Sequence, residues 1–221
     1  MNKIIPSFTS QRSRLSKEKI DIVKSDILPK YEISSFHEVS TFQNVNIEIG
    51  SGYGYTIIHL AKNNPEKNFI ACEVYIDAIS SMCKKIAAEG LENVRVYVSD
   101  ARLLFEQIPD GFLENIYVLF PDPWPKKKHH KRRIISVDFL KEVKRILQNG
   151  GKCFIATDHD SYKEHICDVI HNQNFLQWQA NTPENFTQEP QWWVRTKYQE
   201  KAILEGRSSV FFTLEKPVKE E

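Results

Sequence analysis

Short apolar runs alternate with stretches of helical spacing along most of the chain. Val45-Asn46-Ile47-Glu48-Ile49 has the composition of a buried strand, and a helix is predicted soon after it. The predicted strands occupy residues 45–49, 68–74, 94–98, 115–120, 153–157, 175–179 and 208–215. The predicted helices occupy residues 55–63, 76–89, 101–107, 136–147 and 160–172, with a further segment at 196–205. This order predicts an α/β fold with a doubly wound, mostly parallel, seven-stranded sheet that binds ligands at the carboxyl ends of its strands.

The two ends of this pattern set the predicted domain organisation. Residues 1–14 are polar and suggest a loose arm, after which Ser16 can cap a helix that Pro29 stops. We therefore expect an N-terminal arm and helix over residues 1–40 and one domain over residues 41–221. Further on, Gly150-Gly151 is expected to close the helix over 136–147.

Composition adds that this is a globular chain. Of its 221 residues 41% are hydrophobic, 27% are charged and 11% are aromatic, which is ample material for a core. The opening residues do not resemble a secretory signal, and about 18 consecutive apolar residues occur nowhere. The four cysteines form no Cys-x-x-Cys pair. A cytoplasmic protein with no membrane segment and no metal is expected.

Charge is distributed unevenly, although the net charge is only +1. Residues 126–133 read Lys-Lys-Lys-His-His-Lys-Arg-Arg, so the rest of the chain is net acidic. Such a run can be a solvated surface segment, but a basic patch on an acidic body also fits a polyanion bound at one place.

A glycine loop and three acids indicate which kind of ligand binds at the strand ends. Gly50, Gly52 and Gly54 follow the first predicted strand, where glycines allow a close approach of ligand to backbone, but neither the dinucleotide nor the P-loop spacing is present. An acid such as Glu48, two residues before the first glycine, suits a cationic ligand better than a phosphate. Glu73 and Asp100 end the next two strands and could accept from ribose hydroxyls and from the adenine amino group. The set resembles the S-adenosylmethionine site of class I methyltransferases.

The most specific segment is Phe120-Pro121-Asp122-Pro123-Trp124-Pro125-Lys126, which follows the fourth strand. Two prolines flank Asp122, which predicts a stiff, outward-facing turn that carries the acid and Trp124. A structural alternative is a proline-rich turn over a buried tryptophan. Because the basic run starts at Lys126, a candidate phosphate-binding segment is joined directly to a candidate reacting centre.

These motifs resemble the bacterial tRNA (guanine-N7)-methyltransferase family from the Arg12-x-Arg14 arm to the last strand. The resemblance also rests on Lys131-Arg132-Arg133, Ala156-Thr157-Asp158 and Arg195-Thr196-Lys197-Tyr198. It implies that Asp122 is the catalytic acid residue. The cofactor-binding residues implied are Glu48, Gly50, Gly52, Gly54, Glu73, Asp100 and Asp122. The tRNA-binding residues implied are Lys126, Asp158, Thr196, Lys197, Tyr198 and Gln199, the last standing where the family usually has Glu.

The resemblance implies methyl transfer from S-adenosyl-L-methionine to N7 of guanine 46 in the variable loop of tRNA, by a monomer or homodimer. Trp192-Trp193 are expected to cover the core beside a loop. Three alternatives stay open: a methyltransferase acting on an exocyclic amine of nucleic acid, a noncatalytic RNA-binding subunit and a nicotinamide-dependent oxidoreductase. The motif of the first has two prolines after its acid, the second would have a degenerate cofactor site, and the glycine spacing counts against the third.

Overall fold

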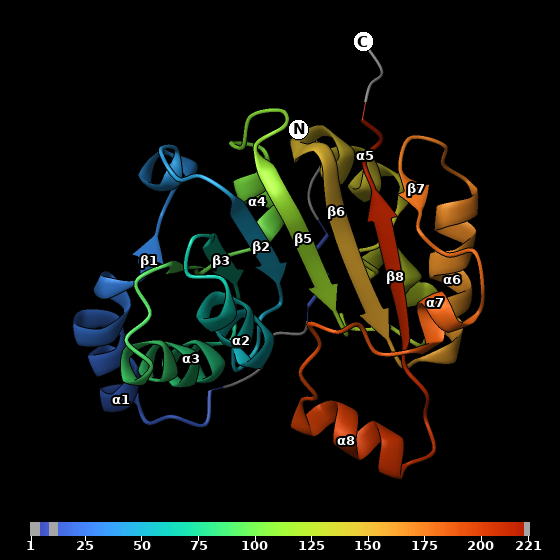
Figure 1. The fold of residues 1–221 in the computed structure, drawn as a ribbon. Coiled ribbons are helices and arrows are strands. Elements are labelled where there is room, and N and C mark those ends of the chain that lie inside the picture. Colours follow the sequence, from blue (N-terminus) through green and yellow to red (C-terminus); the bar gives the residue numbers. More distant parts are fainter. Residues whose placement is uncertain (1–4, 9–12, 219–221) are drawn as a thin grey trace.

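The computed structural model describes residues 5–8 and 13–218, which fold around one mixed sheet (Figure 1). The strand order is β1-β4-β3-β2-β5-β6-β8-β7, and all neighbours are parallel except that β8 runs antiparallel to β6 and β7. The strands are β1 (Glu32–Ile33), β2 (Val45–Ile49), β3 (Asn68–Cys72), β4 (Val94–Tyr97), β5 (Leu113–Leu119), β6 (Leu147–Thr157), β7 (Gln177–Trp178) and β8 (Val210–Glu215). The predicted α/β class and mostly parallel sheet are confirmed.

The described residues contain eight strands where seven were expected. The additional strand is β1, two residues in the segment expected to be an extension, which pairs with the edge of β4. Glu32-Ile33 is too short for a period-2 pattern, so only its register with Val96 and Tyr97 identifies it.

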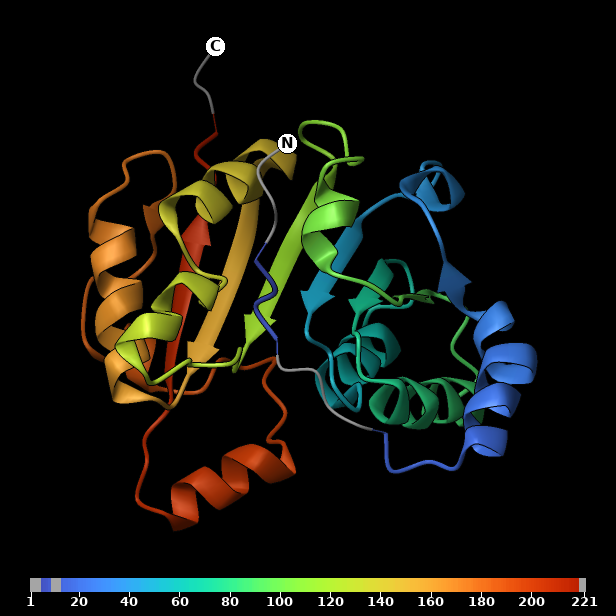
Figure 2. The ribbon, with the colours of Figure 1, turned by 180° about the vertical axis from the view of Figure 1, so that it is seen from behind.

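Helices cover both faces of the sheet. One layer contains α1 (Lys17–Ile22), α2 (Tyr55–Asn63) and α3 (Ile76–Ala88), and Figure 2 shows the other, with α4 (Ala101–Phe105), α5 (Val137–Ile146) and α6 (Asp160–His171). The remaining helices are α7 (Glu184–Thr187), α8 (Lys197–Leu204) and the 3₁₀ segments η2 (Leu28–Lys30), η3 (Phe36–Val39) and η4 (Lys127–Arg132), with a π turn η1 (Val23–Ile27) after α1. Ser16 caps α1 as expected, but the expectation that Pro29 stops this helix is wrong, because α1 ends at Ile22 and Pro29 lies within η2. Among the described residues, no helix is long and apolar enough to span a membrane.

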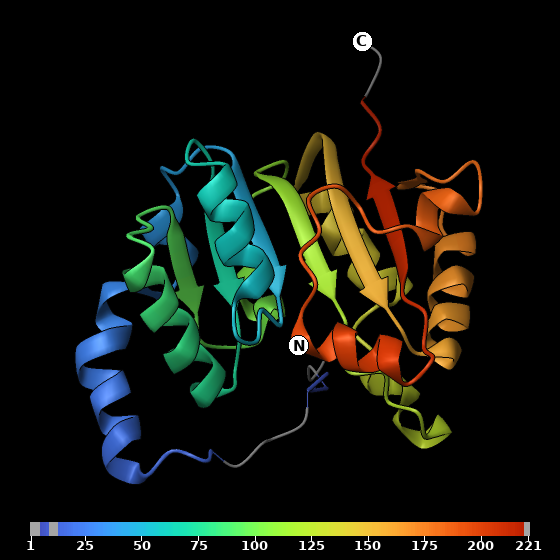
Figure 3. The same cartoon turned by 60° about the horizontal axis from the view of Figure 1, so that its bottom comes forward.

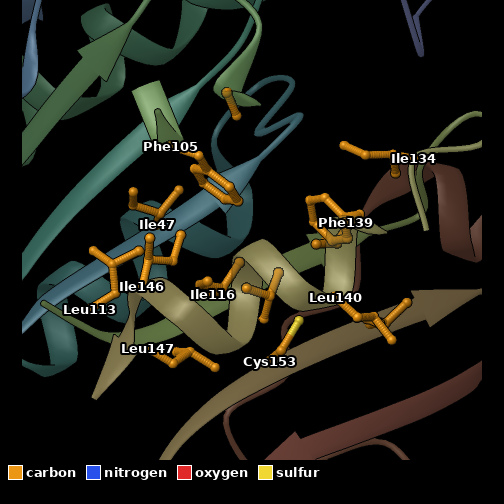
Figure 4. Close-up of a cluster of buried hydrophobic side chains, with 14 of the residues drawn as sticks. Ile47, Phe105, Leu113, Ile116, Ile134, Phe139, Leu140, Ile146, Leu147 and Cys153 are labelled. Carbon is orange, nitrogen blue, oxygen red and sulfur yellow. The ribbon is translucent and has the colours of Figure 1, made fainter. Parts of the chain in front are cut away.

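Each helical layer has its own core. Figure 4 shows the larger cluster, in which Phe105 of α4 and Phe139 of α5 pack on the sheet beside Ile47 and Ile116. Successive side chains of a strand point to opposite faces, so Glu48 faces the other cluster, level with Ala71 of β3 and Tyr117 of β5. An acidic side chain is thereby fixed inside the α2/α3 layer.

The expected role of Gly150-Gly151 as a helix end is wrong. Helix α5 ends at Ile146, and β6 begins at once with Leu147 paired to Leu113. The register with β5 then shifts, and both glycines lie inside the strand. A Cβ at Gly151 would come 2.8 Å from the Glu114 carbonyl oxygen, so this glycine permits a close approach of two strands.

Candidate active site at the carboxyl ends of the strands

A cavity of about 310 Å³ opens at the carboxyl ends of β2, β3 and β5. These strand ends lie at the bottom of Figure 1, which Figure 3 turns toward the viewer. The wall brings together five of the predicted residues: Gly50, Gly52, Glu73, Asp100 and Asp122. Because the carboxyl ends of parallel strands meet at one edge, residues up to 72 positions apart in sequence share one hollow.

The glycine loop between β2 and α2 depends on left-handed backbone conformations. Gly50, Gly52 and Gly54 have φ angles of 72°, 53° and 76°, which other residues rarely adopt. The amides of Gly50 and Ser51 both donate to the Cys72 carbonyl, at 2.8 and 3.1 Å, and so fix the loop to the end of β3. The loop is therefore held in place by backbone bonds to the neighbouring strand.

Glu73 joins this loop to the start of α3. Its carboxylate accepts from the amide of Gly52 at 2.7 Å and from the amides of Val74 and Tyr75 at 2.7 and 2.9 Å. Three backbone donors hold a charged acceptor in one orientation at the cavity wall.

Glu48 lies beneath the loop and, within the described chain, is not part of the cavity wall. Its side chain is buried at 4% exposure, and its Oε2 has no hydrogen-bond partner among the described residues. Burial, together with the nearby negative charge of Glu73, raises the pKa of Glu48 to about 8. The acid expected to bind the cofactor is thus mainly protonated at neutral pH, and it lies beneath the glycine loop rather than in the cavity wall.

Asp100 lines the cavity but is engaged by an arginine that the motifs did not single out. Asp100 caps α4 through the Arg102 amide, and its two oxygens accept from Nε and Nη2 of Arg102 at 2.9 and 2.6 Å. Arg102 also donates to the Ile5 carbonyl of the N-terminal arm.

The turn that carries Asp122 is strained and faces partly inward. Phe120 and Trp124 bracket it with φ angles of 51° and 44°, a costly conformation for side chains of this size. The expectation that Trp124 faces outward is wrong, because its ring is 8% exposed. The buried Arg133 holds the turn from below: its Nε donates to the Pro123 carbonyl, and its Nη atoms bind Ser161.

The basic run forms η4, and its cations have different environments. Lys126, Lys127, Lys128 and Lys131 are exposed, and the described residues provide none of them with an acidic partner. Arg132 stacks over Trp124, with Cζ 3.7 Å from a ring centroid. Four lysines are therefore available to a polyanion, while Arg132 and Arg133 are built into the fold.

The N-terminal arm crosses the cavity on this side. Trp124 Nε1 donates to the Ser7 carbonyl, and Arg132 donates to those of Pro6 and Phe8, all at 2.9 Å. Ser7 and Phe8 consequently form part of the cavity wall, and Figure 2 shows residues 5–8 running beside α4. Arg14 also lines the cavity, whereas Arg12 lies outside the described residues.

Apart from Lys126, which precedes η4, the predicted tRNA-binding residues form a second group around β6 and α8. Asp158 follows β6 and pairs with Arg207, whose other nitrogen binds Glu205 at 2.7 Å. Thr196 caps the start of α8, where its Oγ1 accepts from the Gln199 amide. Lys197 and Tyr198 are in α8, and their side chains lie outside the described part of the structure. Figure 3 shows this helix beyond the carboxyl ends of β5 and β6.

Gln199 is 2% exposed, and both ends of its amide are used. Its Oε1 accepts from Trp193 Nε1 at 2.7 Å, and its Nε2 donates to Glu189 at 2.9 Å. Trp192 packs on Tyr117 and Phe154, which confirms that this tryptophan pair covers the core. The sequence pattern missed Arg102, Glu189 and Arg207, because each is identified only by a partner brought close in the fold.

Comparison with known proteins places this chain in a family. A family model described as "Putative methyltransferase" matches residues 43–212. A tRNA (guanine-N(7)-)-methyltransferase of Wolbachia pipientis wMel is 36% identical over 216 residues, which is 96% of this chain and 92% of that protein. One of Rhizobium johnstonii is 32% identical over 98% of this chain and 87% of that protein. The chain belongs to the tRNA (guanine-N7)-methyltransferase family.

Solved structures confirm the methyltransferase fold at low sequence identity. The 16S rRNA methyltransferase KamB has a TM-score of 0.58 at 16% identity, over 82% of this methyltransferase and 93% of KamB. A Streptococcus mutans putative methyltransferase in complex with SAH has a TM-score of 0.53 at 12% identity, over 91% and 99% of the two chains. The curated relatives confirm the family resemblance inferred from the Pro-Asp-Pro-Trp turn, and the solved structures confirm the fold.

Proposed function

We propose that this enzyme transfers a methyl group from S-adenosyl-L-methionine to N7 of a guanine in tRNA, at position 46 of the variable loop. The observation that carries the proposal is Asp122, which stands at the edge of the carboxylate-lined cavity and begins the segment that continues into the exposed lysines of η4. Reacting centre and polyanion site thus adjoin. A tRNA substrate is consistent with the expected cytoplasmic location.

The cavity residues suit the methyl donor. When bound, S-adenosylmethionine supplies an electrophilic methyl group on a sulfonium sulfur. The volume of about 310 Å³ falls within the range of small-molecule sites, and Glu73 and Asp100 present acceptors of the kind that a ribose and an adenine amine need. The unpartnered Oε2 of Glu48 lies below the glycine loop, where a cationic ligand above the loop favours its ionised form.

The residues of the site are expected to position guanine N7 against the methyl group, and they do not need to remove a proton. Guanine N7 has an in-plane lone pair and no proton, so no general base is needed at that atom. Alignment of nucleophile and methyl can contribute several kcal/mol, up to roughly 7–11 in the best intramolecular models. The strained turn holds Asp122 where its carboxylate can stabilise the positive charge that develops on the guanine ring.

Asp158 is the proposed reader of the guanine edge. Guanine presents N1–H and an exocyclic amine side by side, and a carboxylate offers two acceptors for them. The pair with Arg207 orients this carboxylate before the base arrives. Thr196 and the α8 segment would contact the tRNA backbone nearby.

The deciding experiment uses an unmodified tRNA transcript and methyl-labelled S-adenosylmethionine, followed by borohydride and aniline cleavage, which cuts RNA at 7-methylguanine. A single cut in the variable loop is expected. Label without cleavage would indicate another atom, such as an exocyclic amine, and no label on any tRNA would favour a noncatalytic RNA-binding protein.

Asp122→Asn tests the catalytic assignment in the same assay. The substitution keeps the size of the side chain and removes its charge, so kcat should fall by about 10²-fold or more while the KM for tRNA changes little. Lys131→Gln, which removes an exposed charge from the same basic run, is the matched control for kcat. Near-normal turnover of Asp122→Asn would contradict the assignment.

A further inference from the structure

A second hollow lies directly beside the cavity and shares one residue with it. Its wall consists of Asp122, Pro123, Trp124, Pro125, Lys126 and His129. Two proline rings, an indole and an imidazole make this surface largely apolar, apart from the acid and the lysine. Lys126 in this wall is exposed, and so is the next residue along the chain, Lys127.

His129 provides an aromatic side to this hollow. Its ring lies edge-on to Trp124, with centroids 5.7 Å apart and planes at 89°, and its amide donates to the Lys126 carbonyl at 2.7 Å. Partial burial and the surrounding cations, first Lys128 and then Arg132, Lys126 and Lys131, lower the pKa of His129. Both effects favour the neutral form of the imidazole, although it stands in a run of cations.

An apolar wall of this kind suits the face of a nucleobase rather than its hydrogen-bonding edge. Aromatic surfaces bind every base in a similar way, because every base has a π face. A target guanine would need acceptors for its N1–H and amine, and those belong with Asp158. The ammonium group of Lys126, in the wall of the hollow, matches the phosphate of a nucleotide held there.

We propose that the hollow between the Pro123–Pro125 turn and His129 binds the nucleotide next to the target guanine, with its base on the prolines and the imidazole and its phosphate at Lys126. This inference rests on the proposed function, because Asp122 is what places the target base beside the hollow. It makes His129 a stacking residue, in contrast to the phosphate-binding lysines around it.

The protein side of the test compares His129→Ala, His129→Phe and His129→Lys by their affinity for an unmodified tRNA transcript over a range of salt concentrations. The alanine variant should bind about 5- to 100-fold more weakly with an unchanged salt slope, because a stacking contact is lost and no phosphate contact is. The phenylalanine variant should bind within about 3-fold of wild type. Lys126→Ala, by comparison, should lower the salt slope by about 0.7 to 0.9.

Two results on the protein side would overturn the inference. One is wild-type affinity in His129→Ala, and the other is better rescue by lysine than by phenylalanine, which would identify a phosphate contact. Urea unfolding of each variant checks that affinity is not lost through misfolding, and the phenylalanine variant keeps the test decisive if the alanine variant is unstable.

The RNA side uses transcripts with an abasic nucleotide on either side of the target guanine. The wild type should bind one of the two abasic transcripts as weakly as His129→Ala binds the unmodified transcript. His129→Ala should bind that abasic transcript with little further loss of affinity, since both changes remove the same contact. Replacing that nucleotide by any of the other bases should change affinity by less than about 3-fold. Equal binding of both abasic transcripts by the wild type would overturn the inference, whereas the cleavage assay reports separately on the proposed function.

Discussion

At the scale of single residues, burial decides how Glu48 behaves. A carboxyl group whose folded-state pKa is raised to about 8 keeps its proton in the native state, while the unfolded chain loses it near pH 4.5. Its contribution to stability is therefore fully present below about pH 4.5 and is lost as pH rises toward 8. Above that value both states are ionised and the contribution is constant.

Glu48→Gln should remove this pH dependence. The variant keeps the shape and hydrogen-bonding capacity of the protonated acid, so it should match wild type near pH 4.5 and exceed its stability at pH 8 by a few kcal/mol. Urea unfolding of the cofactor-free protein at pH 5, 6.5 and 8 measures the difference. A constant difference between the two proteins across this range would contradict the raised pKa.

The amide of Gln199, at a position where the family usually has Glu, is explained by its contact with Glu189. An acid at this position would place one carboxylate oxygen against Glu189, where the amide Nε2 now donates. Gln199→Glu should therefore destabilise the contact between α8 and the preceding loop by about 1–3 kcal/mol. It should also raise the KM for tRNA, because Gln199 lies in α8, whose start Thr196 caps. Adding Glu189→Gln should supply a new donor to the carboxylate introduced by that substitution and so regain most of the lost free energy of unfolding. A double-mutant cycle of urea unfolding measures this coupling. Additive losses in the double variant would count against this coupling.

At the scale of elements, Gly54 and Gly90 show two separate reasons for a glycine. Gly54 has a φ of 76°, and a Cβ there would also lie 2.5 Å from Cγ of Met82, a fully buried side chain of α3. Gly90, after α3, has a similar φ of 64° but open space around it. The first position combines backbone strain with a steric conflict, and the second has strain alone.

Gly90→Ala should cost about 1–2 kcal/mol, the strain of a left-handed non-glycine residue, and Gly54→Ala clearly more. Thermal or urea unfolding of the cofactor-free protein gives both values. Equal costs would mean that Met82 moves aside without penalty, and the packing of α2 against α3 would then be looser than the structure indicates.

How much of each element the sequence predicted depended on its length and period. Helices α2, α3 and α6 and strands β2, β3, β4 and β5 lie where the apolar periodicity placed them, within a few residues. The pattern failed at Gly150-Gly151, where tertiary pairing of β6 with β5 overrides the usual meaning of glycine as a helix end. The expectation that Trp124 faces outward also failed. Arg132 and the N-terminal arm cover its ring, and these contacts exist only in the folded structure.

At the scale of the whole molecule, the basic run has two parts with different environments. Lys126, Lys127 and Lys128 face solvent, whereas Arg132 binds the arm whose Ser7 and Phe8 line the cavity proposed to hold the cofactor. Neutralising the cations of residues 126–133 as one group would therefore combine two effects. The structure separates them by residue.

The triple variant Lys126→Ala/Lys127→Ala/Lys128→Ala should lower the slope of log affinity for tRNA against log salt by about 2 to 3 and leave cofactor affinity unchanged. Arg132→Ala should instead weaken cofactor binding, because it frees the arm at the cavity wall. Calorimetry with the cofactor and filter binding with tRNA measure the two affinities. Loss of both affinities to the same extent in the triple variant would contradict this division.

By itself, the sequence determined the fold class, the methyltransferase family and the identity of the acids at the strand ends. These follow from apolar periodicity and from short motifs such as Pro-Asp-Pro-Trp, which are local along the chain. Only the tertiary structure decided that Glu48 lies below the cavity, that Arg102 and Arg207 hold Asp100 and Asp158, and that the arm lies against Trp124. Burial and pairing between distant segments set these environments, and neither is encoded in the spacing of residues along one segment.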